Sequence, residues 1–323
     1  MPAESIVMMT ETEDAQARKI LASLPWLQNL PHDVFTLTRL GGMTNAVFRV
    51  EAPGEETIII RIPGPGTEAY INRQAEIANT RAAAQTGVTP AVLFADPASG
   101  VMVTRYIAGS TTMTPAQFRA IPGAPYRAGQ SLRQLHQSGQ EFVGRFELFA
   151  MIEDYLTLLT KKQAQLPPGY HEVVKAAQPI RAALFARPVA LAPCHCDPLS
   201  ENFLDTGDKM WIVDYEYGGM NDPLWDLGDL AVEAEFTEDM EAELLNAYFG
   251  RVASPAEKGR MVIYKAMCDL LWTLWGLIQH ADGNPANDFW TYAMGRFARC
   301  QTLMGQEAFA HHIQAVLADR TAA

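Results

Sequence analysis

The spacing of hydrophobic residues changes about one third of the way along this chain of 323 residues, and this change constrains the fold most strongly. Between residues 35 and 107 the apolar residues occur in short β-branched runs bounded by Gly, Pro or Asp, which is typical of strands. From residue 125 onward they recur at the spacing of amphipathic helices. The sequence therefore predicts an α+β chain, with a small sheet first and a larger, mainly helical part after it. The runs expected as strands are residues 46–50, 57–62, 91–94 and 101–107.

One helix is expected within the strand-rich third, over the Ala-rich residues 68–85. The Gly-, Thr- and Pro-rich stretch 108–115 predicts a boundary between an N-terminal lobe, residues 15–109, and a C-terminal lobe, residues 110–323. Residues 1–14 carry four acidic side chains and are expected to form a flexible, solvated tail. The rear part is expected to hold one short strand, residues 210–213, and helices over residues 126–136, 146–165, 171–186, 224–235, 238–249, 255–279, 288–304 and 308–317.

The charge balance argues against nucleic acid and membrane surfaces as partners. Lys and Arg number 25 against 37 Asp and Glu, a formal net charge of −12, and no basic run offers a surface for phosphate backbones or anionic lipids. Four cysteines are too few for a disulfide framework and suit a reducing compartment. Because the acidic start lacks the features of a secretory signal, we expect a cytoplasmic protein. Nothing in the sequence indicates an oligomeric state.

Two other patterns in the sequence are weak. Residues 64–69 follow a predicted strand and open a predicted helix, but no acidic residue ends a following strand about 20 positions on, as a dinucleotide site needs. Cys194, His195 and Cys196 offer part of a zinc site, but no second Cys or His pair completes four ligands. Neither pattern predicts a cofactor.

The strongest chemical signal is an H-x-D-x-x-x-x-N motif formed by His195, Asp197 and Asn202, with Asp214 twelve residues later at the end of an apolar strand. Transfer of a γ-phosphoryl group to an alcohol needs a carboxylate beside the acceptor hydroxyl and oxygen ligands for a magnesium ion on the phosphates. An Asp and an Asn five residues apart on a looped segment can serve both needs, and a second Asp on the adjacent strand completes the metal site. The alternative is a polar turn in which Asp197 and Asp214 only cap backbone groups.

A phosphate-binding part is expected in the N-terminal sheet. Gly41 and Gly42 lie between two strands, where backbone N–H groups can approach phosphate oxygens, although a simple hairpin turn is the alternative. Arg61 is the one cation on its strand, and Glu76 follows on the predicted helix. A kinase-like site needs such a cation held by a helix carboxylate, and an arginine must serve because residues 20–160 contain no Lys. An ordinary salt bridge between strand and helix is the other interpretation.

Together these motifs resemble the choline/ethanolamine kinase family, within the wider group of aminoglycoside-phosphotransferase-like small-molecule kinases. The resemblance covers most of the chain and implies a two-lobed, protein-kinase-like fold. A small antiparallel sheet with one helix would form the nucleotide-binding lobe, and the larger helical lobe would carry catalysis and acceptor binding. The implied activity is Mg²⁺- and ATP-dependent phosphorylation of a small amino alcohol. The segments that carry the resemblance are residues 41–45, 60–64, 194–202, 214–217 and 226–229, with Glu233 beyond them.

The resemblance also implies roles for single residues. Asp197 corresponds to the catalytic base, and His195 would orient its loop without transferring protons. Asn202 and Asp214 correspond to the magnesium ligands. The pair that grips the ATP phosphates corresponds to Arg61 and Glu76, and the phosphate loop to Gly41, Gly42, Thr44 and Asn45.

The acceptor pocket is expected among aromatic side chains. Trp272 and Trp275 share one face of a predicted helix, which in an arbitrary protein is more typical of core packing. A quaternary ammonium group cannot donate N–H hydrogen bonds, so aromatic faces and a nearby carboxylate must bind it. The acceptor-binding residues that the resemblance implies are Asp197, Tyr217, Glu233, Trp272, Trp275, Phe289 and Tyr292.

Choline is the expected acceptor, and ethanolamine, thiamine and an aminoglycoside are the alternatives. A polycationic aminoglycoside would need several acids in the acceptor cleft, whereas the sequence offers aromatic residues. A different class of function, a nucleotide-binding pseudokinase with a regulatory role, is also open. The presence of all the expected chemical groups argues against it.

Overall fold

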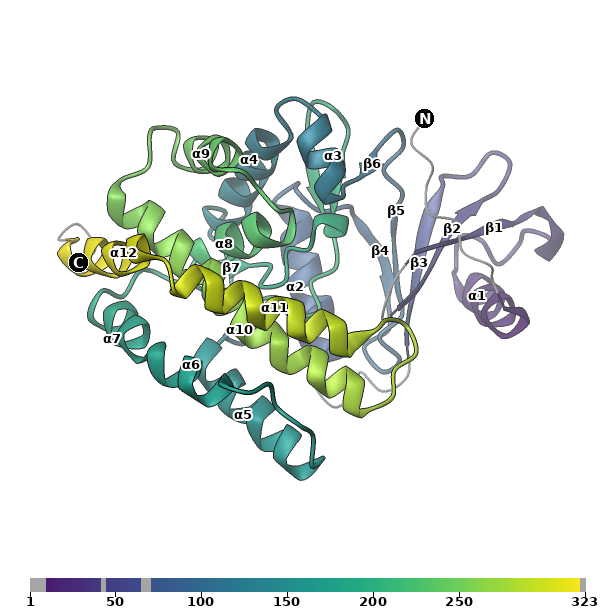
Figure 1. The fold of residues 1–323 in the computed structure, drawn as a ribbon. Helices are drawn as coiled ribbons and strands as arrows, with labels where there is room; N and C mark the ends of the chain where they lie inside the picture. Colours follow the sequence, from purple (N-terminus) through teal and green to yellow (C-terminus); the bar gives the residue numbers. More distant parts are fainter. Residues whose placement is uncertain (1–9, 42–44, 65–70, 320–323) are drawn as a thin grey trace.

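The computed structural model describes residues 10–41, 45–64 and 71–319, which form a sheet-bearing small lobe beside a larger helical lobe (Figure 1). The small lobe holds a five-stranded antiparallel sheet with strand order β1-β2-β3-β5-β4. Phe48 lies opposite Ile60 in the central strands, and both are fully buried. The predicted α+β class is confirmed. The strands are β1 (Thr36–Leu40), β2 (Asn45–Glu51), β3 (Ile58–Pro63), β4 (Val92–Ala95) and β5 (Met102–Arg105).

The predicted flexible tail over residues 1–14 is wrong at its end, because helix α1 spans Glu11–Ser23. Residues 1–9 lie outside the described residues. The Thr10 hydroxyl accepts a hydrogen bond from the Glu13 N–H at 3.2 Å, and the Glu13 carboxylate accepts one from the Thr10 N–H at 2.9 Å. This capping box starts the helix, and the burial of Ala17 and Leu21 in the hydrophobic cluster of the small lobe holds it there.

Helix α2, Arg73–Gln85, begins later than the predicted residue 68. Asn72 caps it, since its side-chain oxygen accepts hydrogen bonds from the N–H groups of Gln74 and Ala75, both at 3.1 Å. Residues 65–70 lie outside the described residues, so the first part of the predicted helix is not described.

Helix α2 contacts strand β4 of the sheet and is also bonded to the large lobe. Ala83 belongs to the hydrophobic cluster of the helical lobe, and no α2 residue is among the described members of the small-lobe cluster. Asn79 Nδ2 donates to Gly218 O at 2.7 Å. At the carboxyl end of the helix, Gln134 Nε2 donates to Thr86 O at 2.6 Å. The carboxylates and cations on α2 are therefore fixed relative to the large lobe.

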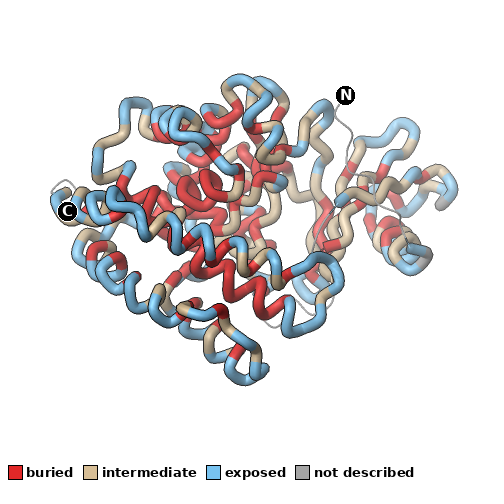
Figure 2. Tube along the Cα trace, in the orientation of Figure 1, coloured by how far each residue is buried: buried red, intermediate tan, exposed pale blue. Residues whose placement is uncertain are grey.

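The large lobe is built around α10, Pro255–Ala281, whose buried course is visible in Figure 2. By length and composition α10 could cross a membrane, but 94% of its most apolar window is buried inside the protein, so it is the core helix of this lobe. The predicted helix over residues 171–186 is two helices, because Pro179 in the first turn of α7 cannot continue the helix before it. The other helices are α3 (Pro115–Ala120), α4 (Ala124–His136), α5 (Leu148–Lys161), α6 (Tyr170–Ala176), α7 (Gln178–Ala186), α8 (Leu224–Glu233), α9 (Glu238–Phe249), α11 (Phe289–Met304) and α12 (Glu307–Ala318).

Short strands in the large lobe position two loops. Strand β7 (Ala192–Cys194) pairs with β10 (Gly219–Asn221), and β8 (Phe203–Asp205) lies between β6 (Thr111–Thr112) and β9 (Met210–Ile212). The sequence predicted the β9 strand alone. Residues 195–202 connect β7 to β8, and residues 213–218 connect β9 to β10, so both parts of the predicted catalytic motif lie on loops that link these two small sheets.

Candidate active site

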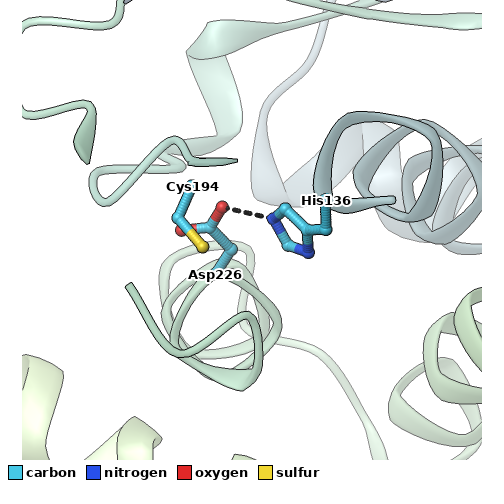
Figure 3. A group of neighbouring side chains, drawn as sticks. All are labelled: His136, Cys194 and Asp226. Carbon is cyan, nitrogen blue, oxygen red and sulfur yellow. Dashed lines mark hydrogen bonds and ion pairs between the residues drawn. The ribbon is translucent and has the colours of Figure 1, made fainter. Parts of the chain in front are cut away.

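The loop that begins at His195 is held in place by the buried carboxylate of Asp226 on α8. Asp226 Oδ2 accepts a hydrogen bond from the His195 N–H at 2.7 Å, and Oδ1 accepts one from the Cys196 N–H at 2.8 Å. His136 Nε2 also bonds to Oδ2 at 2.8 Å (Figure 3). Cys196 has a left-handed backbone, with φ 68°, so this anchor holds a turn that a residue with a side chain rarely adopts.

His136, Cys194 and Asp226 lie close enough together to suggest a metal site, but their contacts indicate a structural anchor (Figure 3). Both carboxylate oxygens of Asp226 already accept hydrogen bonds. Burial raises the pKa of the Cys194 thiol well above its ordinary value, so this sulfur stays protonated and is a poor ligand.

The His195 ring orients the loop. Its Nε2 lies 2.8 Å from Val213 O, and its Nδ1 lies 3.3 Å from the Asp197 nitrogen. These partners fix the tautomer, with Nε2 donating to the carbonyl and Nδ1 accepting from the Asp197 N–H. Burial lowers the pKa of His195, which keeps the ring neutral. Both ring nitrogens are engaged by backbone groups, as expected for a positioning residue.

Asp197 and Asn202 are brought together by the turn that the motif spacing predicted. Asn202 Nδ2 donates to Asp197 O at 3.1 Å, which closes the loop. Burial raises the pKa of the Asp197 carboxyl well above its ordinary value, and the negative charges of Glu233 and Asp214 add to the effect. The Asp197 side chain therefore lies near both the predicted metal ligand and the predicted acceptor-pocket carboxylate.

Asp214 meets the cation on β3. Arg61 Nη1 donates to Asp214 Oδ1 at 2.6 Å, and Arg61 also forms an ion pair with Glu76 of α2. Burial raises the pKa of Asp214 to about 6, and the positive charge of Arg61 opposes this rise. Carboxylate oxygens of Glu76, Asp214 and Glu216 lie within 4.8 Å of one another. The structure thus brings Arg61, Glu76 and Asp214 into one network, of which the sequence predicted the pairing of Arg61 with Glu76.

Two members of this network, Arg73 and Glu216, were not predicted from sequence. Arg73, in the first turn of α2, donates to Glu76 Oε2 at 2.8 Å and to Glu216 Oε1 at 2.7 Å. Asn45 Nδ2 also donates to Glu216 Oε1, at 2.9 Å. Burial alone would raise the pKa of Glu216, but Arg61, Arg73 and Asn45 outweigh it and hold the pKa below its ordinary value. The available signal was the spacing Asp214-x-Glu216, which places both carboxylates on one loop.

A cavity of about 460 Å³ opens between the lobes and includes Arg61, Glu76, Asn202 and Asp214 in its lining. Gly41 also borders it, whereas Gly42 and Thr44 of the predicted phosphate loop lie outside the described residues. The apolar wall of this cavity includes Ile59, Met102, Ile107, Leu204 and Val213. Sequence reasoning missed this wall, because each of the five residues has the pattern of an ordinary strand or loop. A larger, open hollow of about 970 Å³ beside α4 contains none of the predicted site residues.

The five predicted aromatic residues form one continuous group. Tyr217 and Trp272 have ring centroids 5.0 Å apart, and Trp272 and Trp275 6.4 Å. Trp275 then meets Phe289 at 5.5 Å and Tyr292 at 5.8 Å, all in edge-to-face geometry. Both tryptophans belong to the hydrophobic core, which agrees with the core interpretation of this helix face, and their part in acceptor binding stays a prediction.

Close contact between α10 and α11 sets the position of Tyr292. A Cβ atom added to Gly276 would lie 2.7 Å from Tyr292 Cδ1 and 3.2 Å from Ala293 Cβ. A larger residue at position 276 would therefore push this wall of the aromatic group away.

Glu233, the predicted pocket carboxylate, has a cationic partner that sequence reasoning missed. Arg296 of α11 forms an ion pair with Glu233, and its guanidinium carbon lies 4.7 Å from the centroid of the Tyr292 ring. Arg296 Nη1 also donates to Asp269 Oδ1 at 3.2 Å. The signal was helical spacing, since Arg296 follows Tyr292 by four residues on one helix face.

Known proteins share this arrangement. Residues 36–264 match the model of the phosphotransferase enzyme family. The chain is 56% identical to a choline/ethanolamine kinase family protein of known structure from Mesorhizobium loti, with 94% of this chain and 99% of that chain covered and a TM-score of 0.86. It is 28% identical to the choline kinase LicA from Streptococcus pneumoniae, with 91% and 99% covered and a TM-score of 0.76.

A further relative is ethanolamine kinase 2 of Mus musculus, which is 24% identical over 303 residues, with 83% of this chain and 75% of that protein covered. These likenesses agree with the two-lobed, kinase-like fold described above. The chain therefore belongs to the phosphotransferase enzyme family and, within it, to the choline/ethanolamine kinase family of ATP-dependent small-molecule kinases.

Proposed function

We propose that this chain transfers the γ-phosphoryl group of ATP to the hydroxyl of a small cationic amino alcohol, with choline as the first candidate. The position of Asp197 between two sets of residues carries the proposal. Its carboxyl interacts electrostatically with Asp214 and Glu216 of the loop after β9, and also with Glu233 of α8 and Arg296 of α11. The first set suits metal-bound phosphates, and the second lies at the aromatic group that suits a small cation.

The cavity between the lobes supports ATP as the phosphoryl donor. Its apolar wall fits the flat face of a nucleotide base, and Arg61 lies among the carboxylates of its lining. A relative named LicA has been solved in complex with AMP. In this chain Arg61, held by Glu76, is the cation proposed to bind the ATP phosphates.

The residues that would hold Mg²⁺ are Asn202 and Asp214, with Glu216 beside them. Carboxylate and amide oxygens are the hard ligands that this ion prefers, and the cluster of carboxylates around Asp214 fits it. The Asn202 amide nitrogen bonds to Asp197 O, which leaves the amide oxygen for the metal. When bound, the ion would supply positive charge against the phosphate oxygens.

Asp197 acts on the acceptor. It would accept a hydrogen bond from the substrate hydroxyl and take its proton as the oxygen attacks the γ-phosphorus. The raised pKa of Asp197 makes its ionised form a stronger base than an exposed carboxylate. His195 and Asn202 hold the backbone on both sides of this carboxyl.

The aromatic group supports choline ahead of ethanolamine. Five rings in one connected group would offer aromatic faces to a quaternary ammonium, each face contributing about 0.5–2 kcal/mol. Ethanolamine remains the alternative, because its ammonium group could donate to a carboxylate and a relative bears that name. An aminoglycoside ranks lower, since Glu233 is already paired with Arg296 and gives little excess negative charge to a polycation. Thiamine stays an alternative for the substrate panel.

A substrate panel tests the proposal and separates it from a pseudokinase. ADP formation should be measured with choline, ethanolamine, thiamine and an aminoglycoside, each with and without Mg²⁺. We expect magnesium-dependent turnover with choline and a loss of about 10²- to 10⁴-fold in Asp197→Asn, with ATP binding retained. Nucleotide binding without turnover of any alcohol would favour the pseudokinase. The proposed setting is the cytoplasm, which suits a chain whose cysteines are all free thiols.

A further inference from the structure

A buried carboxyl that the mechanism does not use lies near Glu233, the predicted carboxylate of the acceptor pocket. Helices α8 and α10 approach closely at Gly228, where an added Cβ would lie 2.7 Å from Met261 O. This approach places the next residue, Asp229, against Cys268. The Cys268 thiol donates to Asp229 Oδ1 at 2.7 Å, and Asp229 itself is fully buried. Asp229 Oδ2 is buried as well and has no hydrogen-bond partner among the described residues.

The charges around Asp229 do not balance. The groups that face it are Glu233 on its own helix, Cys268 on α10, Arg296 on α11, and Asp197 and Cys196 on the catalytic loop. The one cation in this set is Arg296.

Arg296 is already committed to two other carboxylates, because it pairs with Glu233 and donates to Asp269. Arg299 adds two further bonds to Asp269, at 2.7 and 2.6 Å, and the described residues show none from it to Asp229. A buried carboxylate without a cation is costly, so the uncharged acid is the stable form of Asp229. Burial, followed by the charges of Glu233 and Asp197, accordingly raises the pKa of Asp229 well above its ordinary value.

We propose that Asp229 couples acceptor binding to proton release: it is a neutral acid in the acceptor-free enzyme and a carboxylate when a small cation occupies the aromatic pocket. This inference rests on the proposed function, because it takes the acceptor to be cationic. The step breaks one O–H bond of the Asp229 carboxyl, and the proton passes to the solvent buffer. No covalent bond forms between Asp229 and the acceptor. Asp229 acts only by gaining a negative charge near the bound cation.

A metal ion is the other occupant that Asp229, Glu233 and Cys268 could suggest, since their ligand atoms lie within 4.8 Å of one another. Two observations favour the proton. Burial raises the pKa of the Cys268 thiol well above its ordinary value, and Arg296 already occupies Glu233. A metal ion would thus find a protonated thiol and a paired carboxylate beside Asp229, so the cation that this proposal brings near Asp229 is the substrate.

The sign of the coupling is fixed by linkage. A positive charge beside Asp229 stabilises its ionised form, so a cationic acceptor lowers the pKa of Asp229 when it binds. Binding then releases a proton, and the affinity for the acceptor must rise with pH, by up to about tenfold for each pH unit through the titration. Choline is the suitable probe, because its quaternary nitrogen keeps the same charge at every pH.

The test is calorimetric titration of choline into the full chain with magnesium and a non-hydrolysable ATP analogue, in two buffers with different ionisation enthalpies. The difference in heat gives the number of protons released. We expect release in the wild type, reduced by at least half in Asp229→Asn and unchanged in Asp154→Asn, which removes an exposed carboxyl of α5. Equal release in the wild type and Asp229→Asn overturns the proposal.

A second variant keeps the test sharp if Asp229→Asn fails to fold. Cys268→Ala removes the thiol that stabilises the Asp229 carboxylate, so proton release should move to higher pH. An unchanged pH range contradicts the proposal.

The two proposals fail in different ways. Ethanolamine is titrated in parallel, and no binding heat from either alcohol overturns the proposed function and this inference with it. Binding heat without proton release overturns the role of Asp229 alone.

Discussion

Arg61 of the small lobe donates a hydrogen bond to Asp214 Oδ1 of the large lobe at 2.6 Å. The same guanidinium pairs with Glu76, so one side chain connects the sheet, the anchored helix α2 and the loop that follows β9. Arg61 therefore lies against an oxygen that the proposed metal site would use. When magnesium and the ATP phosphates bind at this site, the Arg61 guanidinium would have to shift from Asp214 toward the phosphates.

Arg61→Ala should damage ATP use far more than acceptor use. We expect kcat/KM for ATP to fall about 100-fold, because a charge on the phosphates is lost, with little change in the KM for choline. Arg61→Lys should recover only part of the loss, since a single ammonium cannot bridge Glu76 and Asp214 as a guanidinium does. Steady-state kinetics with each substrate varied would decide, and equal shifts in both KM values would reduce Arg61 to a structural salt bridge.

Asp226→Asn should destabilise the protein and its catalytic loop together. An amide nitrogen in place of one oxygen would face N–H donors of His195, Cys196 or His136. We expect the free energy of unfolding to fall by about 2–4 kcal/mol, measured by urea denaturation, together with a fall in kcat. The surface control Asp154→Asn should change the unfolding free energy by less than about 0.5 kcal/mol. A variant of normal stability and activity would show that the loop does not depend on this anchor.

Gly276→Ala should weaken acceptor binding without affecting ATP. The added methyl group would push Tyr292 away from α10, so the KM for choline should rise about tenfold while the KM for ATP stays the same. Gly295→Ala on α11 is the matched control, because nothing described lies within 4 Å of its added Cβ. It should leave both KM values unchanged and stabilise the helix by up to about 1 kcal/mol. Equal effects of the two substitutions would separate Tyr292 from acceptor binding.

The pH dependence of kcat/KM for ATP should report the titration of the Asp214 carboxyl. Its pKa lies at about 6, so protonation on the acid side removes a metal ligand and kcat/KM for ATP should fall below that pH. Because magnesium and the proton compete for the same carboxylate, saturating magnesium should move the acid limb to lower pH. An acid limb that stays in place at every magnesium concentration would assign it to another group. The profile is measured by initial rates at low and at saturating magnesium.

Local sequence pattern was enough to predict those parts of the fold and site that depend on neighbouring residues. The strands around Ile60, the long core helix and the turn from His195 to Asn202 all follow from short-range spacing. The capping box of Thr10 and Glu13 also marks the start of α1 in the sequence, but the acidic residues around it favour a solvated tail, and that prediction is wrong from Glu11 onward.

Contacts between distant segments could not be predicted in this way. Arg73 and Glu216 are 143 positions apart in the sequence, so they meet only when α2 packs on the large lobe. Arg296 reaches Glu233 across two packed helices, and its type and spacing are those of many exposed helix residues. The apolar wall of the nucleotide cavity likewise exists only when two lobes face each other.

The attachment of α2 to the large lobe affects how Arg61 on the sheet can move relative to Glu76 on that helix. The Glu76 carboxylate lies on α2, and hydrogen bonds of Asn79 and Gln134 hold this helix against the large lobe, which carries the catalytic loops. Any rocking of the sheet thus carries Arg61 toward or away from a stationary counter-charge. The match between Arg61 and the Glu76 carboxylate would then depend on what occupies the cavity between the two lobes.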